Sequence, residues 1–195
     1  MRFDIELVGK IGSMALIDQV HHELDYNKFA RIGKQLRPGM IWVSSGAAEI
    51  GRLDYMKRCG RELEGDADEV KTDYAAQGQA ILMNTYRDFI DPKFGVRQVL
   101  VEHYHFNDPD KRAHIQQMLL RAPGQNAIPI INYNDAASCE ETRKMEIRRL
   151  MKTQGSAVEL VDNDETASQI ACLVHAGTLL ILSALDGIYR DLHDP

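Results

Sequence analysis

The chain has 195 residues, a length at which one domain buries roughly 70% of the surface that its unfolded chain would expose. Its 23 lysines and arginines against 29 aspartates and glutamates, with an isoelectric point near 5.6, exclude an overall basic excess for binding nucleic acid. No apolar stretch approaches the roughly 18 residues of a membrane span, and the N-terminus lacks the apolar core of a signal peptide. We therefore expect one cytoplasmic domain over residues 1–195, without nucleic-acid or membrane partners.

Strand and helix patterns alternate along the first half of the chain. The expected order is a strand near 3–9, a helix that contains Phe29, Ile32 and Leu36, a strand at 40–44, and a helix that follows a turn between Gly46 and Gly51. Residues 59–70 are polar and punctuated by glycine, so we expect a mobile surface connection that could serve as a lid.

The same alternation continues in the second half. A long helix is expected from an apolar stripe that consists of Tyr74, Gly78, Ile81, Leu82, Tyr86 and Phe89. A strand at 96–102, a helix around Ile115, Met118 and Leu119, and a strand at 128–132 follow it. The remaining elements are a helix from Ser138 to about Met151, an apolar run at 158–161, a helix near Asp164, and a strand at 179–182. Such alternation is typical of a mostly parallel sheet that is covered on both faces.

Four of the apolar runs end in small, polar or acidic residues. These endings are Lys10-Ile11-Gly12-Ser13, Ser44-Ser45-Gly46-Ala47, Asn132-Tyr133-Asn134-Asp135 and Asp162-Asn163-Asp164. Because the carboxyl ends of parallel strands lie along one edge of a sheet, the four endings are predicted to meet in one crevice. They could hold a small polar substrate beside a phosphate.

Each ending also has a structural interpretation. Lys10 before a Gly-Ser turn suggests a phosphate contact, or a surface lysine at the end of a strand; neither GxxxxGK[ST] nor GxGxxG is present. Ser45 and Gly46 could bind an anion or form a plain turn into a helix, and the GxSxG pattern of a nucleophilic serine is missing. Asp135 and Asp164 could accept from an ammonium, although isolated Asp residues are often helix caps.

Cysteine and histidine patterns indicate neither a disulfide framework nor a metal site. Cys59, Cys139 and Cys172 are odd in number and lack a CxxC pair, so we expect reduced thiols, with Cys172 in the core. His103 and His105 would share one face of a strand, but without a third ligand we interpret them as a solvated strand end. We predict no protein-bound metal.

Six segments spread almost end to end form a recognisable set: Lys10-Ile-Gly-Ser13, Val43-Ser-Ser-Gly-Ala-Ala-Glu-Ile-Gly-Arg52, Ala75-Ala-Gln-Gly-Gln-Ala-Ile-Leu-Met83, Ile128-Pro-Ile-Ile-Asn-Tyr-Asn-Asp135, Val161-Asp-Asn-Asp164 and Leu182-Ser-Ala-Leu-Asp-Gly-Ile-Tyr189. In this order they resemble the amino acid kinase family, and within it the glutamate 5-kinases. The resemblance implies a single domain folded as a three-layer α/β/α sandwich with a mostly parallel sheet. It further implies a homo-oligomer that transfers the γ-phosphoryl of ATP, with Mg²⁺, to the side-chain carboxylate of L-glutamate in proline biosynthesis.

The resemblance also implies roles for particular residues. Lys10 would contact the transferring phosphoryl and Asp164 would orient that lysine. Gly12, Ser13 and Ser183 would lie at the phosphates of the nucleotide, and the acceptor would be held by Ser45, Gly46, Asp135 and Asn163. Phosphoryl transfer requires mainly alignment and charge neutralisation, so no catalytic His or Cys is expected.

Three features depart from the pattern of that family. Ser183-Ala184 stand where relatives carry Thr-Asp near the nucleotide, and the sequence stops at Pro195 where relatives continue into a nucleotide-binding half. Residues 137–157 look longer and more helical than in glutamate 5-kinases, and Tyr133 replaces a usual Glu.

These departures leave three hypotheses: a C-terminally truncated glutamate 5-kinase, a non-catalytic relative that binds an amino acid or another metabolite, and a kinase of the same fold with another small acid or phosphate as acceptor. The basic helix at 140–152 is interpreted either as a solvated face or as a cover over the phosphates.

Overall fold

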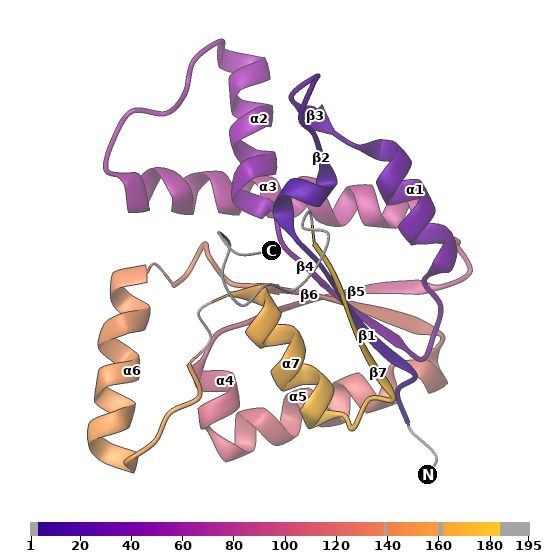
Figure 1. Cartoon of the computed structure of the whole chain (residues 1–195), viewed down its shortest axis with the longest axis vertical. Coiled ribbons are helices and arrows are strands. Elements are labelled where there is room, and N and C mark those ends of the chain that lie inside the picture. The colour runs from indigo at the N-terminus through magenta and orange to yellow at the C-terminus, as the bar shows by residue number, and fades with distance from the viewer. Residues whose placement is uncertain (1–3, 139, 160–161, 184–195) are drawn as a thin grey trace, which may run out of the picture.

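A computed structural model describes residues 4–138, 140–159 and 162–183 of the chain (Figure 1). Its centre is a five-stranded sheet in the order β5-β6-β4-β1-β7, in which all the pairings are parallel. The strands are β1 (Leu7–Ile11), β4 (Met40–Ser44), β5 (Gly95–Val101), β6 (Ala127–Tyr133) and β7 (Thr178–Leu182). A short antiparallel hairpin of β2 (Ile17–Asp18) and β3 (Glu23–Leu24) lies outside this sheet.

Helices follow the strands along the chain. They are α1 (Tyr26–Gln35), α2 (Ala47–Cys59), α3 (Ala67–Phe89), α4 (Tyr104–Asn107), α5 (Pro109–Arg121), α6 (Glu140–Gln154) and α7 (Asn163–Leu173), with short 3-10 turns at η1 (Ser13–Leu16) and η2 (Pro123–Gln125). An aspartate begins four of these helices by accepting hydrogen bonds from backbone N–H groups of the first turn: Asp25, Asp66, Asp108 and Asp162.

Two layers of helices cover the sheet, and strand residues alternate between them. Trp42 packs on one face with Phe29 of α1 and Leu82 of α3. Val43 packs on the other face with side chains from α4, α5 and α7, including Phe106 and Ile170. Because successive strand residues point to opposite faces, the apolar runs supply both cores at once. The α/β class, the parallel sheet and the three-layer sandwich are therefore confirmed.

Close helix packing holds α2 against α3. A Cβ added to Gly78 of α3 would overlap the carbonyl oxygen of Ala47, the first residue of α2. A Cβ on Gly51 would likewise overlap the carbonyl oxygen of Tyr74. The two glycines thus allow the helix backbones to touch, and this contact fixes where α2 begins at the edge of the sheet.

The expected bounds of two segments are wrong. The first strand is Leu7–Ile11, because it pairs with β4 and β7 as far as Ser44 and Leu182, so Lys10 lies inside it. Residues 67–70 belong to α3, since Asp66 caps that helix; the loop of 60–66 that remains is held by a hydrogen bond from the Leu63 N–H to the Tyr74 hydroxyl, of 2.6 Å.

The apolar run at 158–161 was expected to be a strand, but residues 158 and 159 are not in one, and residues 160 and 161 lie outside the described part. The backbone of Val158 is instead paired with the side-chain amide of Asn107, which accepts from its N–H at 2.6 Å and donates to its carbonyl at 2.9 Å. The sequence also gave no sign of the β2-β3 hairpin or of α4. Among the described residues, no helix combines the length and apolar composition that crossing a membrane would require.

Candidate functional site

An ion pair joins β1 to α7 at the carboxyl edge of the sheet. The Lys10 Nζ lies 2.6 Å from the Asp164 Oδ1. Lys10 is only 9% exposed and sits between Val43 of β4 and Ile181 of β7 in the sheet register. A lysine in such a position needs a partner because burial penalises its charge. Asp164 supplies that partner, and Asp162 rather than Asp164 caps α7.

The side chain of Asn163 connects three elements next to this ion pair. Its Nδ2 donates to the Ser45 Oγ at 3.0 Å and to the Asn132 Oδ1 at 3.1 Å. Its Oδ1 is buried and has no hydrogen-bond partner among the described residues. Buried amide oxygens in native proteins are normally satisfied, so this oxygen is available to a donor on a ligand. An ammonium group would be such a donor.

Asn132 and Gln79 were not among the predicted site residues, although both lie in the quoted segments. The Asn132 Nδ2 donates to the Gln79 Oε1 on α3 at 2.9 Å, and the Asn132 Oδ1 also accepts from the Tyr133 N–H. Asn132 is 2% exposed at the end of an otherwise apolar strand. A single amide inside a buried strand was the signal in the sequence that could have identified it, because buried polar groups need specific partners.

The adjacent serines Ser44 and Ser45 have different surroundings. Ser44 is fully buried, and its hydroxyl lies 2.9 Å from the Tyr86 hydroxyl, which also accepts from the Trp42 indole at 2.9 Å. Burial raises the pKa of Tyr86 to about 12, so this phenol stays neutral. Ser44 therefore belongs to the core, while Ser45 faces Asn163 and the candidate site.

Two Gly-Ser turns meet beside Lys10. Gly46 has a φ of 103°, a left-handed conformation that favours glycine, and a Cβ there would lie 3.5 Å from the Ser13 Cα. A Cβ on Gly12 would lie 3.7 Å from the Lys10 Nζ and so would occupy the space in front of the ammonium. The first turn of α2 has no side-chain cap, which leaves its N–H groups directed toward the same region. Backbone donors and one ammonium suit an anion such as a phosphate.

Asp135 follows β6 at the same edge, two residues beyond the end of the strand. Burial raises the pKa of its carboxyl, while the positive charges of Lys71 and Arg143 lower it in part. No hydrogen bond links Asp135 to Asn163 within the described part of the chain. The structure therefore pairs Lys10 with Asp164 and Ser45 with the neighbouring Asn163, and Asp135 lies beyond them on the side of β6.

Ser183 comes directly after β7, whose last residue, Leu182, accepts from the Gly12 N–H at 3.2 Å. This register places Ser183 beside the Gly12 turn, as a phosphate contact would require. The rest of the segment that runs to Tyr189 lies outside the described residues.

Two expectations about His and Cys are wrong. His103 is fully buried rather than solvated, with its Nε2 3.1 Å from the Glu146 Oε2, and burial lowers its pKa. The reason is that α4 begins at the next residue and folds over the strand end, where the His105 Nδ1 accepts from the Glu102 N–H. Cys172 is exposed on α7 instead of lying in the core. In the described ranges, no group of three or more His, Cys, Asp or Glu side chains is arranged to hold a metal.

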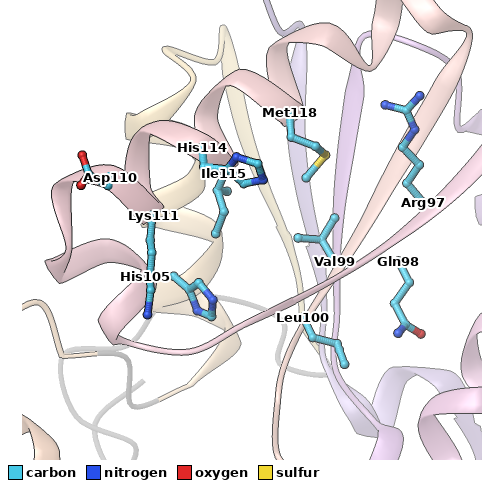
Figure 2. Close-up of a pocket in the computed structure, with 10 residues that line it drawn as sticks. All are labelled: Arg97, Gln98, Val99, Leu100, His105, Asp110, Lys111, His114, Ile115 and Met118. Atoms are coloured by element: carbon cyan, nitrogen blue, oxygen red, sulfur yellow. The ribbon is translucent and has the colours of Figure 1, made fainter.

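A separate hollow of about 780 Å³ lies along the outer strand β5 and beneath α5 (Figure 2). Apolar side chains of Val99, Ile115 and Met118 form its floor, with Arg97 on the strand side and Lys111 on the helix side. None of the predicted site residues lines it. The candidate site therefore remains the carboxyl edge of β1, β4 and β6.

Comparison with known proteins gives a consistent family. The model of the amino acid kinase family matches residues 6–194. A glutamate 5-kinase of Symbiobacterium thermophilum is 34% identical over 153 residues, which cover 77% of this chain and 50% of that protein. A glutamate 5-kinase of Streptococcus suis is 31% identical over 193 residues, covering 94% of this chain and 47% of that protein.

A third relative, the glutamate 5-kinase of Alkaliphilus metalliredigens, is 30% identical over 191 residues, which cover 94% of this chain and 64% of that protein. The chain thus spans about half the length of the first two relatives and somewhat more of the third.

Proposed function

Because the chain belongs to the amino acid kinase family, we propose that its site takes part in the ATP-dependent phosphorylation of the side-chain carboxylate of L-glutamate, which yields glutamyl 5-phosphate for proline biosynthesis. The names of the relatives support this acceptor and this co-substrate. ATP would arrive with Mg²⁺ as the second substrate.

One observation supports the proposal: the nearly buried Lys10 is ion-paired with Asp164, and the preceding residue, Asn163, has a buried amide oxygen without a hydrogen-bond partner among the described residues. Strands β1, β4 and β6 are adjacent, so the edge from Lys10 to Asp135 spans two strand spacings, about 10 Å. An amino acid placed along this edge would have its ammonium near Asn163 and Asp135. Its side-chain carboxylate would then point toward Lys10.

Each side chain has a defined task in this proposal. Lys10 neutralises charge that develops on the transferring phosphoryl, and Asp164 keeps the ammonium in place. Gly12 leaves room for phosphate oxygens, and Ser13 and Ser183 supply donors to them. Ser45 and Gly46 position the acceptor together with Asn163 and Asp135. The carboxylate of glutamate is already ionised near pH 7, so it needs no general base.

Removing one fixed lysine that neutralises transition-state charge can lower the rate by several powers of ten, because each loss of about 1.4 kcal/mol in transition-state stabilisation lowers the rate tenfold. Alignment of the two substrates contributes separately. The cytoplasmic location, the homo-oligomer and the absence of nucleic-acid partners stay predictions.

The experiment is ATP consumption with L-glutamate and Mg²⁺, measured on this chain and on any longer form of it, together with calorimetric binding of L-glutamate. Glutamate-dependent consumption by either form supports the kinase. Glutamate binding without consumption by either form would instead support the hypothesis of a non-catalytic amino-acid-binding relative. Consumption with a different small acid, but not with glutamate, would support the hypothesis of another acceptor.

A further inference from the structure

Helix α6 lies between two parts of the candidate site along the chain. It begins at Glu140, five residues after Asp135, and ends at Gln154, before Asp162 and Asn163. In Figure 1 it stands at the border of the molecule, beside α4. Within residues 143–154, the half-buried side chains are spaced as one face of a helix, while Arg148 and Arg149 are exposed; the half-buried residues are Arg143, Glu146, Ile147 and Leu150. The face that carries Arg143 is therefore turned toward the body of the protein.

Two contacts of this face hold α6 against the ends of β5 and β6. The Glu146 Oε2 lies 3.1 Å from the Nε2 of the buried His103. The guanidinium of Arg143 lies 5.5 Å from the centre of the Tyr133 ring, and the Tyr133 hydroxyl is 3.2 Å from the Ser138 Oγ. Tyr133 is 5% exposed and is the last residue of β6, so its ring is a fixed platform for the guanidinium.

The guanidinium of Arg143 lies over the ring of Tyr133, and Asp135 follows Tyr133 by two residues, so Arg143 is at the same end of β6 as Asp135. Both Arg143 and Lys71 of α3 oppose the rise that burial causes in the pKa of the Asp135 carboxyl. Asp135 makes no hydrogen bond to either cation within the described residues, so the three groups are not locked into a closed salt bridge. Asp135 and the guanidinium at Tyr133 thus give the end of the site on the side of β6 one negative and one positive charge, and Lys71 also acts on the Asp135 carboxyl.

We infer that Arg143 is a specificity-determining residue that binds the α-carboxylate of the acceptor, while Asp135 binds its α-ammonium. This inference rests on the proposed function and assigns an arrangement of charges to it. The zwitterionic end of an α-amino acid presents one anion and one cation, which match Arg143 and Asp135. The planar guanidinium can bind a carboxylate through two parallel hydrogen bonds, which a lysine cannot do.

The test compares L-glutamate with L-isoglutamine, in which an amide replaces only the α-carboxylate. Calorimetry on the full chain gives the ratio of the two dissociation constants. A charge-assisted pair predicts that the wild-type chain binds glutamate about 10- to 100-fold more tightly than isoglutamine. Arg143→Ala should bring this ratio to within about twofold of one, and Arg143→Lys should restore it only in part.

Two matched variants separate recognition from helix docking. Arg148→Ala removes an exposed arginine of the same helix and should leave the wild-type ratio unchanged. Glu146→Gln weakens the docking contact with His103 but keeps the guanidinium, so it should also keep the ratio. Circular dichroism checks that each variant is folded.

A wild-type ratio that persists in Arg143→Ala overturns the inference while the proposed function stands. Equal losses of the ratio in Arg143→Ala and Glu146→Gln also overturn it, because docking of α6 would then be the cause. A wild-type chain that does not discriminate between glutamate and isoglutamine overturns it as well. If neither this chain nor any longer form of it binds L-glutamate, both the inference and the proposed function are overturned.

Discussion

The Lys10 Nζ lies 2.6 Å from the Asp164 Oδ1, where β1 ends and α7 begins. The lysine is nearly buried, whereas the side chain of Asp164 is 45% exposed. The pair therefore keeps a charged ammonium at an edge that a substrate can reach from the side of Asp164. We propose separable roles for the two residues, charge neutralisation for Lys10 and orientation of its ammonium for Asp164.

Replacing Lys10 tests the first role. Lys10→Ala should lower glutamate-dependent turnover by several powers of ten, since the charge that neutralises the phosphoryl is lost. Lys28→Ala is the matched control, because Lys28 pairs with Asp25 on the surface at 3.1 Å. Steady-state kinetics on both variants measure the effect. Unchanged turnover in Lys10→Ala would remove the lysine from the mechanism.

Replacing Asp164 tests the second role. Asp164→Asn leaves a nearly buried ammonium without a counter-charge, so the free energy of unfolding should fall by about 1–3 kcal/mol. Turnover should fall as well, because the ammonium is no longer held in one position. Urea denaturation measures the first effect, with Glu6→Gln as a control at the exposed ion pair of Glu6 and Arg37. Equal stabilities of the wild type and Asp164→Asn would show that the pair does not hold Lys10.

Asp135 should show opposite effects on stability and on binding. Its pKa is raised by burial, so the ionised form costs stability once the pH rises above the unfolded value of 3.8 and through the folded value. Asp135→Asn should therefore make the chain equally stable or more stable at pH 7. The same variant should weaken glutamate binding about 10- to 100-fold, because a charge-assisted hydrogen bond is lost. Wild-type affinity together with lower stability would contradict this account of Asp135.

The burial of His103 should make the protein less stable in mild acid. Its folded pKa lies below 6.5, chiefly because of burial, so the unfolded chain takes up a proton first as the pH falls. Its contribution is fully present above about pH 6.5 and declines as the pH falls through the folded pKa. The pKa of His105 is shifted in the same direction. His103→Gln should therefore lose less unfolding free energy than the wild type between about pH 7 and pH 5.5. Identical pH profiles from urea denaturation would contradict the prediction.

Gly78 should tolerate no larger side chain. Gly78→Ala would force a methyl group into the backbone of α2 at Ala47, and overpacking of this kind costs about 1–3 kcal/mol. The start of α2 should shift with it, so the affinity for glutamate should fall too. Gly124→Ala is a suitable control, because a Cβ there would meet no neighbour within 4 Å. Thermal unfolding of both variants measures the difference, and equal midpoints would contradict the close contact.

The sequence was sufficient to predict the order of the main helices and strands and the edge of the sheet at which the candidate residues meet. Strands that are buried on both faces of a parallel sheet can be recognised in the sequence as continuous apolar runs, and every residue of β4 and β6 is indeed buried. Helix α3 was predicted from the apolar stripe between Tyr74 and Phe89 and is confirmed there, although it begins earlier, at Ala67.

Features that depend on tertiary partners were not predictable. The role of Ser44 was settled by Tyr86, 42 positions away, and that of Asn132 by Gln79 and Asn163. His103 is buried because α4, which has only four residues, folds over it. Val158 resembled a strand residue until the amide of Asn107 was seen to pair with its backbone. For Ser44, Asn132 and Val158 a side chain far along the chain decided the outcome, and the local spacing of residue types does not indicate such a partner.

The central claim is that the carboxyl edge of β1, β4 and β6 binds the acceptor. The most direct measurement is NMR of the isotope-labelled chain during a titration with L-glutamate. The account predicts saturable shifts at the side-chain amides of Asn163 and Asn132 and at the backbone of Ser45, Gly46 and Asp135. Shifts confined to the hollow along β5, or to the opposite edge of the sheet near Glu6, would contradict it.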